Sequence, residues 1–175
     1  MASNEELKQI TKECIIMALV TLMEKKSFNT ITIGDIVKKA GVSRMAYYRN
    51  FSSKDDILDS LFHKISSELV TCLAPKVLIQ DWKGYWQSLF EQIREHAQAY
   101  RILIEAHHGE KILNYLDDFI HDTQCCETML ASDHYRMVLL AGATYHVLTK
   151  WILDGMQESP ANMAEVCCSI IQLHG

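Results

Sequence analysis

Residues that break regular structure are scarce along this chain. It contains seven Gly and two Pro in 175 residues. An all-β sandwich or barrel needs many closely spaced turns, and turns use Gly and Pro more often than this. Apolar residues make up 49% and charged residues 22% of the chain, which is ordinary for a folded protein. We therefore expect an all-α fold.

The spacing of apolar residues agrees with this expectation. From Glu5 to Lys26 they recur at three- and four-residue steps, which predicts a helix buried along one apolar face. That face comprises Leu7, Ile10, Cys14, Met17, Ala18 and Leu22. Further helices are predicted at 33–40, 44–49, 54 to about 75, 100–106, about 112–120, 133–156 and 160–173, and one more begins after Asp81. Asp81 and Ser132 are the predicted caps of the helices that follow them, and Gly109 is predicted to end the helix at 100–106.

Neither a membrane span nor an export signal is expected. The longest charge-free stretch, Met137 to Thr149, has thirteen residues, whereas a membrane helix needs about 20. The acidic start, Met1 to Glu6, lacks the basic region of a signal peptide. The six Cys lie in apolar helical patterns at positions 14, 72, 125, 126, 167 and 168, a spacing that suits neither a disulfide framework nor paired metal ligands. We expect a soluble, cytoplasmic protein with reduced thiols.

Charge is divided unevenly along the chain. Residues 1–55 carry nine Lys and Arg against six Asp and Glu, whereas residues 56–175 carry eight against sixteen. The N-terminal part is basic and the rest of the chain is acidic, which suggests that the N-terminal part binds a polyanion. Solvated helix faces are also charged for solubility alone, so charge by itself leaves both interpretations open.

The segment from Thr32 to Phe51 predicts two short helices joined by a tight turn. Thr32 and Ser43 are N-cap residues, and Gly41 follows the last turn of the first helix. The inward residues would be Ile36, Val37, Val42 and Tyr47, and the outward residues Arg44, Met45, Ala46, Tyr48 and Arg49. In a helix-turn-helix the second helix enters the major groove. A plain helical hairpin would have the same turn, but the aromatic and basic block at 47–51 with Lys54 favours the DNA-binding motif.

The block from Thr32 to Leu58 resembles the DNA-binding head of the TetR family of bacterial transcription regulators. The motifs that carry this resemblance are Ala40-Gly41-Val42-Ser43, the pair Tyr47-Tyr48, Phe51 and Lys54. The resemblance implies an N-terminal three-helix helix-turn-helix domain over 1–52 and a helical ligand-binding and dimerisation bundle over 53–175. The stretch from Trp151 to Met163 is similar to a subgroup that includes dihydroxyacetone-kinase regulators.

The resemblance also implies roles for individual residues. Arg44 and Met45 would touch bases, Arg44 at the O6/N7 edge of guanine, and Ala46 would pack on a base edge. Tyr48, Asn50, Lys54 and Thr32 would hold phosphates. The complete expected set is Thr32, Ser43, Arg44, Met45, Ala46, Tyr48, Arg49, Asn50 and Lys54. Gly34 stands where many relatives have a groove-reading Arg, so one base contact is expected to be missing.

The remainder of the chain is expected to dimerise. Ala141-Gly142-Ala143 lies in the middle of a predicted helix, where a Gly costs about 1 kcal/mol relative to Ala. Close approach of another helix would explain it, and the family implies a homodimer through about 133–173. The alternative is that these small residues pack against a helix of the same subunit.

An effector site is expected among aromatic residues of the C-terminal part. The candidates are Trp82, Tyr85, Trp86, Phe90, Tyr100, Tyr115, Phe119 and Tyr145. In the family such residues line a pocket, although an ordinary core would use the same residue types. The effector would be a small molecule or a partner protein.

Enzymatic and metal chemistry have little support in the sequence. No phosphate-binding Gly loop, HExxH or Gly-x-Ser-x-Gly motif is present. His107, His108, His121, Cys125 and Cys126 fall close together, but adjacent Cys on a helix point about 100° apart. We expect no catalysis, no metal and no cofactor. The expected function is that of a dimeric repressor on a palindromic operator; the alternative is an activator or co-regulator controlled by a protein partner.

Overall fold

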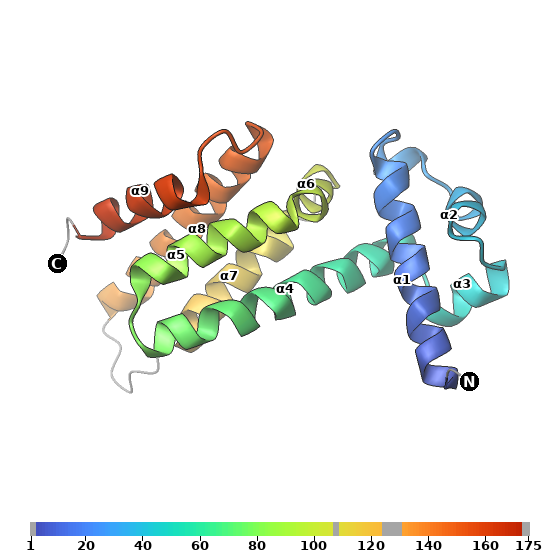
Figure 1. Cartoon of the computed structure of the whole chain (residues 1–175), viewed down its shortest axis with the longest axis horizontal. Helices are drawn as coiled ribbons and strands as arrows, with labels where there is room; N and C mark the ends of the chain where they lie inside the picture. Colours follow the sequence, from blue (N-terminus) through green and yellow to red (C-terminus); the bar gives the residue numbers. More distant parts are fainter. Residues whose placement is uncertain (1–2, 107–108, 124–130, 173–175) are drawn as a thin grey trace. The chain divides into compact units, whose positions relative to one another are not determined.

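The structure is a computed structural model that describes residues 3–106, 109–123 and 131–172. Over these residues all regular structure is helical (Figure 1), which confirms the predicted all-α fold. The chain divides into two compact units, Met1–Ser66 and Ser67–Gly175. The first contains α1 (Asn4–Met23), the 3-10 helix η1 (Phe28–Thr30), α2 (Ile33–Ala40), α3 (Arg44–Asn50) and the start of α4 (Lys54–Leu78). The second contains the end of α4, α5 (Trp82–Glu95), α6 (Ala97–Glu105), α7 (Gly109–Thr123), α8 (Ala131–Leu153) and α9 (Pro160–Gln172).

The first unit is a small three-helix assembly joined by the first turns of α4. Helix α1 packs against both α2 and α3. Residues from all four α-helices and Ile31 form the core, and Ile15, Leu19, Ile31, Ile36, Tyr47, Ile57 and Leu58 are almost completely buried. Burial of these side chains makes the main contribution to the stability of the short helices α2 and α3, because isolated helices of such length are unstable in water.

The buried face of α1 differs from the predicted one. Ala18 is buried, but Leu7, Ile10, Cys14 and Met17 are exposed. The residues that α1 buries instead are Ile15, Ala18, Leu19 and Val20. The helix carries two apolar stripes, and α2 and α3 cover only the one that includes Ile15 and Leu19.

Helix α4 continues past the predicted end at Pro75. It runs to Leu78, and the chain turns at Gln80, which has φ 55°. A Pro removes its own N–H and crowds the carbonyl four residues earlier, but the residues after it can still be helical. The N–H of Asp81 donates to the carbonyl of Lys76 (2.9 Å) and closes the end of the helix.

In the second unit α5 packs on α9, and α8 packs on both α6 and α7. Phe90 of α5 meets Trp151 of α8 edge to face, with ring centroids 5.2 Å apart. Leu89, Phe90, Leu103 and Ala164 are completely buried. As predicted, Asp81 caps α5 by accepting from the N–H of Gly84 (2.9 Å), and Pro160 opens α9.

Several predicted helix boundaries in the second unit were wrong. Ser132 does not cap α8, because that helix begins one residue earlier, at Ala131. Gly109 begins α7 instead of ending α6, and a Cβ at this position would lie 2.2 Å from the hydroxyl of Tyr145. The glycine is therefore explained by the close approach of Tyr145. Helix α8 ends at Leu153 instead of Met156, because Gly155 and Met156 both have positive φ (84° and 54°).

The described helices offer no span long and apolar enough to cross a membrane. Cys14, Cys72, Cys167 and Cys168 have free thiols. Cys125 and Cys126 lie outside the described residues.

Candidate nucleic-acid interface

Local hydrogen bonds build the predicted helix-turn-helix from α2 and α3. Thr32 accepts from the N–H of Asp35 (3.1 Å), and Asp35 in return accepts from the N–H of Thr32 (3.0 Å), which forms a capping box. Gly41 ends α2 with φ 68°, a left-handed conformation that favours glycine. Ser43 then caps α3 by accepting from the N–H of Ala46 (3.0 Å). Together the capping box, the left-handed Gly41 and the Ser43 cap set the angle at which α3 leaves the turn.

Helix α3 has one buried face and one exposed face. Tyr47 is completely buried, and its hydroxyl has no partner among the described residues. Burial is the main reason that the pKa of Tyr47 is raised. On the other face Met45 is 66% exposed and Tyr48 is 57% exposed. Arg44 and Arg49 are also exposed, and Ala46 is half-buried. The helix therefore presents two guanidinium groups, a thioether and a phenol to solvent.

Arg44 lies next to Gly34 of α2. A Cβ built on Gly34 would be 3.7 Å from the Nη2 atom of Arg44. The guanidinium thus occupies space beside the position where the resemblance places a second arginine in relatives. A long side chain at this position would compete with Arg44 for that space.

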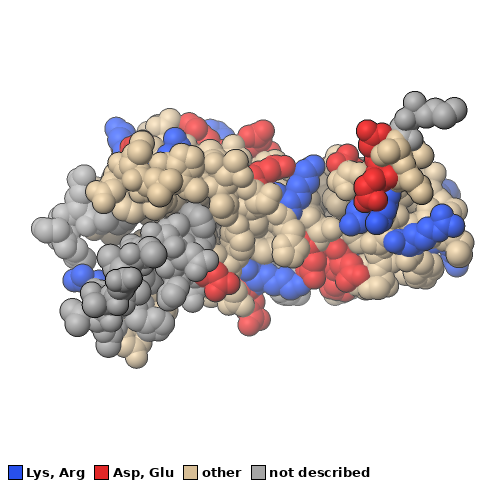
Figure 2. All heavy atoms as spheres, turned by 90° about the horizontal axis from the view of Figure 1, so that it is seen from below, with Lys and Arg blue, Asp and Glu red and all other residues tan. Residues whose placement is uncertain are grey.

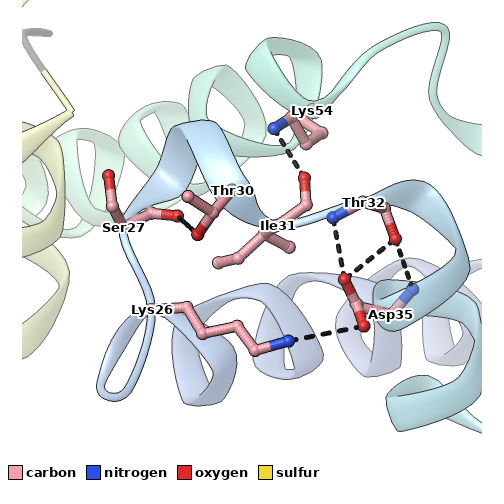
Figure 3. Close-up of polar contacts among 7 residues, drawn as sticks. All are labelled: Lys26, Ser27, Thr30, Ile31, Thr32, Asp35 and Lys54. Carbon is pink, nitrogen blue, oxygen red and sulfur yellow. Dashed lines mark hydrogen bonds and ion pairs between the residues drawn. The ribbon is translucent and has the colours of Figure 1, made fainter.

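The N-terminus of α2 already holds an anionic side chain (Figure 3). The carboxylate of Asp35 accepts from both the N–H and the hydroxyl of Thr32 (3.0 and 2.8 Å) and lies 3.6 Å from the ammonium of Lys26. The hydrogen bonds from Thr32, followed by the charge of Lys26, lower the pKa of Asp35. A phosphate at this helix end would meet a carboxylate, so the hydroxyl of Thr32 is less available to DNA than the resemblance implies.

Asn50 and Lys54 also use their polar atoms within the chain. The Nδ2 atom of Asn50 donates to the carbonyl of Ala46 (2.7 Å), and its Oδ1 is buried with no partner in the described part of the chain. Lys54 donates to the carbonyl of Phe28 (2.8 Å). It also donates to the carbonyl of Ile31 (2.7 Å), as Figure 3 shows. Neither residue has a polar group as open to solvent as those of Arg44, Tyr48 and Arg49.

Basic side chains gather at the end of the first unit, on the right in Figure 2. Lys38 and Lys39 in the last turn of α2 are exposed, as are Arg44 and Arg49 of α3. No acidic residue occurs from residue 36 to residue 54. This cationic surface has the charge that attracts a phosphate backbone.

Sequence reasoning missed the contacts of Lys26, Phe28 and Ile31. The spacing Thr32-x-x-Asp35 is a readable capping-box signal. Nothing in the sequence indicates that Lys26 pairs with Asp35, or that Lys54 reaches two carbonyls more than 20 residues away.

The predicted effector residues divide into buried and exposed groups. Tyr85, Trp86, Phe90 and Tyr100 are buried, Tyr115 and Tyr145 are half-buried, and Trp82 is 46% exposed. The side chain of Phe119 lies outside the described part. Burial raises the pKa of Tyr85 to about 12, and raises that of Tyr100 further, with smaller contributions from Tyr115 and Glu68.

A small cavity lies among these residues. Its walls are Leu69, Val70, Leu73, Tyr85, Tyr115 and Leu116, and its volume is about 10 Å³. Such a volume holds at most about one water molecule. The indole N–H of Trp86 is buried without a partner in the described residues, and an unpaired buried donor is costly.

The metal alternative concerns side chains that the structure does not describe, namely His107, His108, His121, Cys125 and Cys126. Within the described residues no three His, Cys, Asp or Glu side chains are grouped as metal ligands.

Several known proteins are similar to this chain. The nucleoid occlusion factor SlmA of Serratia proteamaculans is 34% identical over 90 residues, which are 51% of this chain and 44% of that protein. SlmA of Sodalis glossinidius is 33% identical over 84 residues, 47% of this chain and 41% of that protein. The chain thus spans less than half the length of these curated relatives.

Two solved structures share the fold. The dihydroxyacetone kinase operon activator DhaS superposes with a TM-score of 0.66 at 14% identity, over 93% of this chain and 94% of that one. Lin0861 from Listeria innocua gives 0.67 at 12% identity, over 100% and 96%. Because both identities are below 25%, these two likenesses concern the fold alone.

Two family models match the chain. The model of bacterial regulatory proteins of the tetR family matches residues 15–61, which include α2, the turn and α3. A second model, the transcriptional regulator C-terminal region, matches residues 80–173, more than half of the chain. The chain therefore belongs to the TetR family, a family of DNA-binding transcription regulators that are not enzymes.

Proposed function

We propose that the protein binds a palindromic operator as a homodimer, with α3 of each subunit in the major groove. The observation that carries this proposal is the exposed face of α3, which presents Arg44, Met45, Tyr48 and Arg49, while Tyr47 anchors the opposite face in the core. Residues 1–52 are the DNA-binding part in this proposal, and 53–175 regulate and dimerise. Binding to bacterial chromosomal DNA would place the protein in the cytoplasm.

Arg44, Met45 and Ala46 are the proposed base contacts. They lie in the first turn of α3, the end of a recognition helix that contacts bases. A bidentate arginine contact discriminates a guanine by about 1–3 kcal/mol. Tyr48, Arg49 and the capping residue Ser43 are proposed phosphate contacts, with Thr32 and Asn50 in lesser roles because their polar atoms are already bonded.

Helices α8 and α9 are the proposed dimer interface. Tyr135, Val138 and Leu139 of α8 and Val166 and Ile170 of α9 are exposed apolar side chains. A Cβ at Gly142 of α8 would meet no atom of the described residues within 4 Å. The open glycine supports close approach of a second subunit over packing within one subunit, and an apolar face of this kind needs a partner.

The second unit is the proposed effector-binding part. The N–H of Trp86, which has no partner in the described part of the chain, would be satisfied by a ligand carbonyl or carboxylate. The small cavity beside Tyr85 and Tyr115 would have to enlarge, so the effector would bind one state of the unit better than the other. We propose repression by promoter occlusion. A solved protein of the same fold is named an operon activator, so activation is the second candidate.

A genome-fragment selection with the purified protein, repeated at two salt concentrations, tests the proposal. We expect one or a few palindromic sites whose affinity falls steeply as salt rises. Arg44→Ala should reduce discrimination at one base position in each half-site. Recovery of no site would reject operator binding by this chain alone and favour a co-regulator that requires a partner protein.

A further inference from the structure

The ammonium group of Lys54 is surrounded by groups of its own chain. Its Nζ atom donates to the carbonyls of Phe28 (2.8 Å) and Ile31 (2.7 Å). It also lies 4.6 Å from the centroid of the Phe28 ring, within range of a cation–π contact. A lysine ammonium has three donors, so two are used by carbonyls before any DNA is present.

The two carbonyls belong to the segment that leads into α2. Phe28 begins η1, and Ile31 is buried directly after it. The next residue, Thr32, is the N-cap of α2 and is bonded to Asp35. Figure 3 shows these contacts in one continuous group, from Lys54 through Ile31 and Thr32 to Asp35 and Lys26. Lys54, the first residue of α4, therefore links that helix to the start of the helix-turn-helix.

We propose that Lys54 is a positioning residue for DNA recognition, acting through Thr32 and α2 on the orientation of α3, and not a phosphate ligand. This inference rests on the proposed function of α3, and it departs from the phosphate contact that the family resemblance implies for Lys54.

Three roles for Lys54 predict different binding behaviour. Removal of a phosphate ligand lowers affinity for every DNA and reduces the slope of log K against log salt, by about 0.9 for each phosphate that is no longer neutralised. A decrease in fold stability alone lowers operator and non-specific affinity by one common factor, because only the folded fraction binds. Disturbed positioning lowers operator affinity while non-specific affinity and both salt slopes stay the same, because non-specific binding needs charge and not the orientation of α3.

The experiment compares Lys54→Met with the unmodified full chain, on the selected operator and on a random duplex, at four salt concentrations. Methionine keeps the apolar stem and removes the charge. We expect operator affinity to fall about tenfold at each salt concentration, the effect of removing one weak hydrogen bond from a charged donor. Affinity for the random duplex should stay within about twofold. Lys25→Met, an exposed lysine after α1, controls for the removal of one charge. Arg49→Met should show the reduced slope expected for a phosphate ligand.

A reduced salt slope in Lys54→Met, or an equal loss of affinity on operator and random duplex, would overturn the positioning role. A measurement without DNA tests the coupling itself. The N–H of Ile36 donates to the carbonyl of Thr32 (3.2 Å) in the first turn of α2. Its hydrogen exchange should be about tenfold faster in Lys54→Met, while exchange at Leu19 of α1 is unchanged. Unchanged exchange at Ile36 would refute the coupling, whereas failure of the unmodified protein to bind any operator would refute only the proposed function.

Discussion

Substitution of Leu139 by Asp tests the proposed dimer at its most exposed apolar position on the interface. Leu139 of α8 is 72% exposed in the single chain. Full burial of a leucine contributes about 1.5–3 kcal/mol, so roughly three quarters of that is available to the interface in each subunit. In a two-fold symmetric dimer the residue occurs twice.

The resulting apolar contribution is about 2–4 kcal/mol for the dimer. Because 1.4 kcal/mol corresponds to a factor of ten, the dimer dissociation constant should rise about 30- to 1000-fold in Leu139→Asp. A carboxylate forced into the interface would add to this effect. Operator binding should fall in parallel, because a single subunit contacts only one half-site.

Sedimentation equilibrium over a range of protein concentrations measures the dissociation constant directly. Leu78→Asp is the matched control, since Leu78 is 84% exposed and lies in α4, outside α8 and α9. An unchanged dissociation constant in Leu139→Asp, or an equal increase in Leu78→Asp, would refute the assignment of the interface to α8 and α9.

Three further predictions concern stability. Gly41→Ala should destabilise the first unit by about 1 kcal/mol, measured by hydrogen exchange at Ile36. A Cβ there meets no atom of the described residues within 4 Å. The cost is therefore that of the left-handed backbone, about 1–2 kcal/mol, less about 0.4–1 kcal/mol because alanine makes the unfolded chain stiffer. No decrease in stability would contradict this. Tyr47→Phe should leave that stability unchanged or raise it by up to about 1 kcal/mol, because the buried hydroxyl has no described partner, and a clear decrease would reveal a partner. Between pH 10 and 12 the free energy of unfolding of the second unit should fall by about 2 kcal/mol through Tyr85, whose pKa is raised to about 12. The folded state keeps its phenol proton while the unfolded state loses it, so stability decreases with rising pH. Tryptophan fluorescence follows this transition, and Tyr85→Phe should reduce the decrease; an equal decrease in that variant would contradict the assignment.

Short-range features of this protein were predictable from its sequence. The caps at Thr32, Ser43 and Asp81, the left-handed Gly41 and the Pro160 helix start all appear as predicted. Each depends on a hydrogen bond or a backbone angle within about four residues. The motif that identified the family lies in the same short segment, so it too was readable.

Which apolar side chains are buried could not be predicted as accurately as these short-range features. Periodicity indicated that α1 has an apolar face, but Leu7 and Met17 are exposed while Ile15 and Leu19 are buried. Trp82 and Trp86 lie one turn apart on α5, yet Trp82 is exposed and Trp86 is buried. Which of two apolar stripes is covered depends on the helices that pack against it, and those come from distant parts of the chain.

The sequence by itself determined the helical class, the position of the helix-turn-helix and the outward residues of α3, because composition, period and caps act locally. Only the tertiary structure decided what Lys54 does. Its partners are the carbonyls of Phe28 and Ile31, and a backbone carbonyl has the same chemistry at every residue. No pattern of side chains can therefore indicate which carbonyls a distant lysine will reach, since that choice is made when α4 packs beside η1.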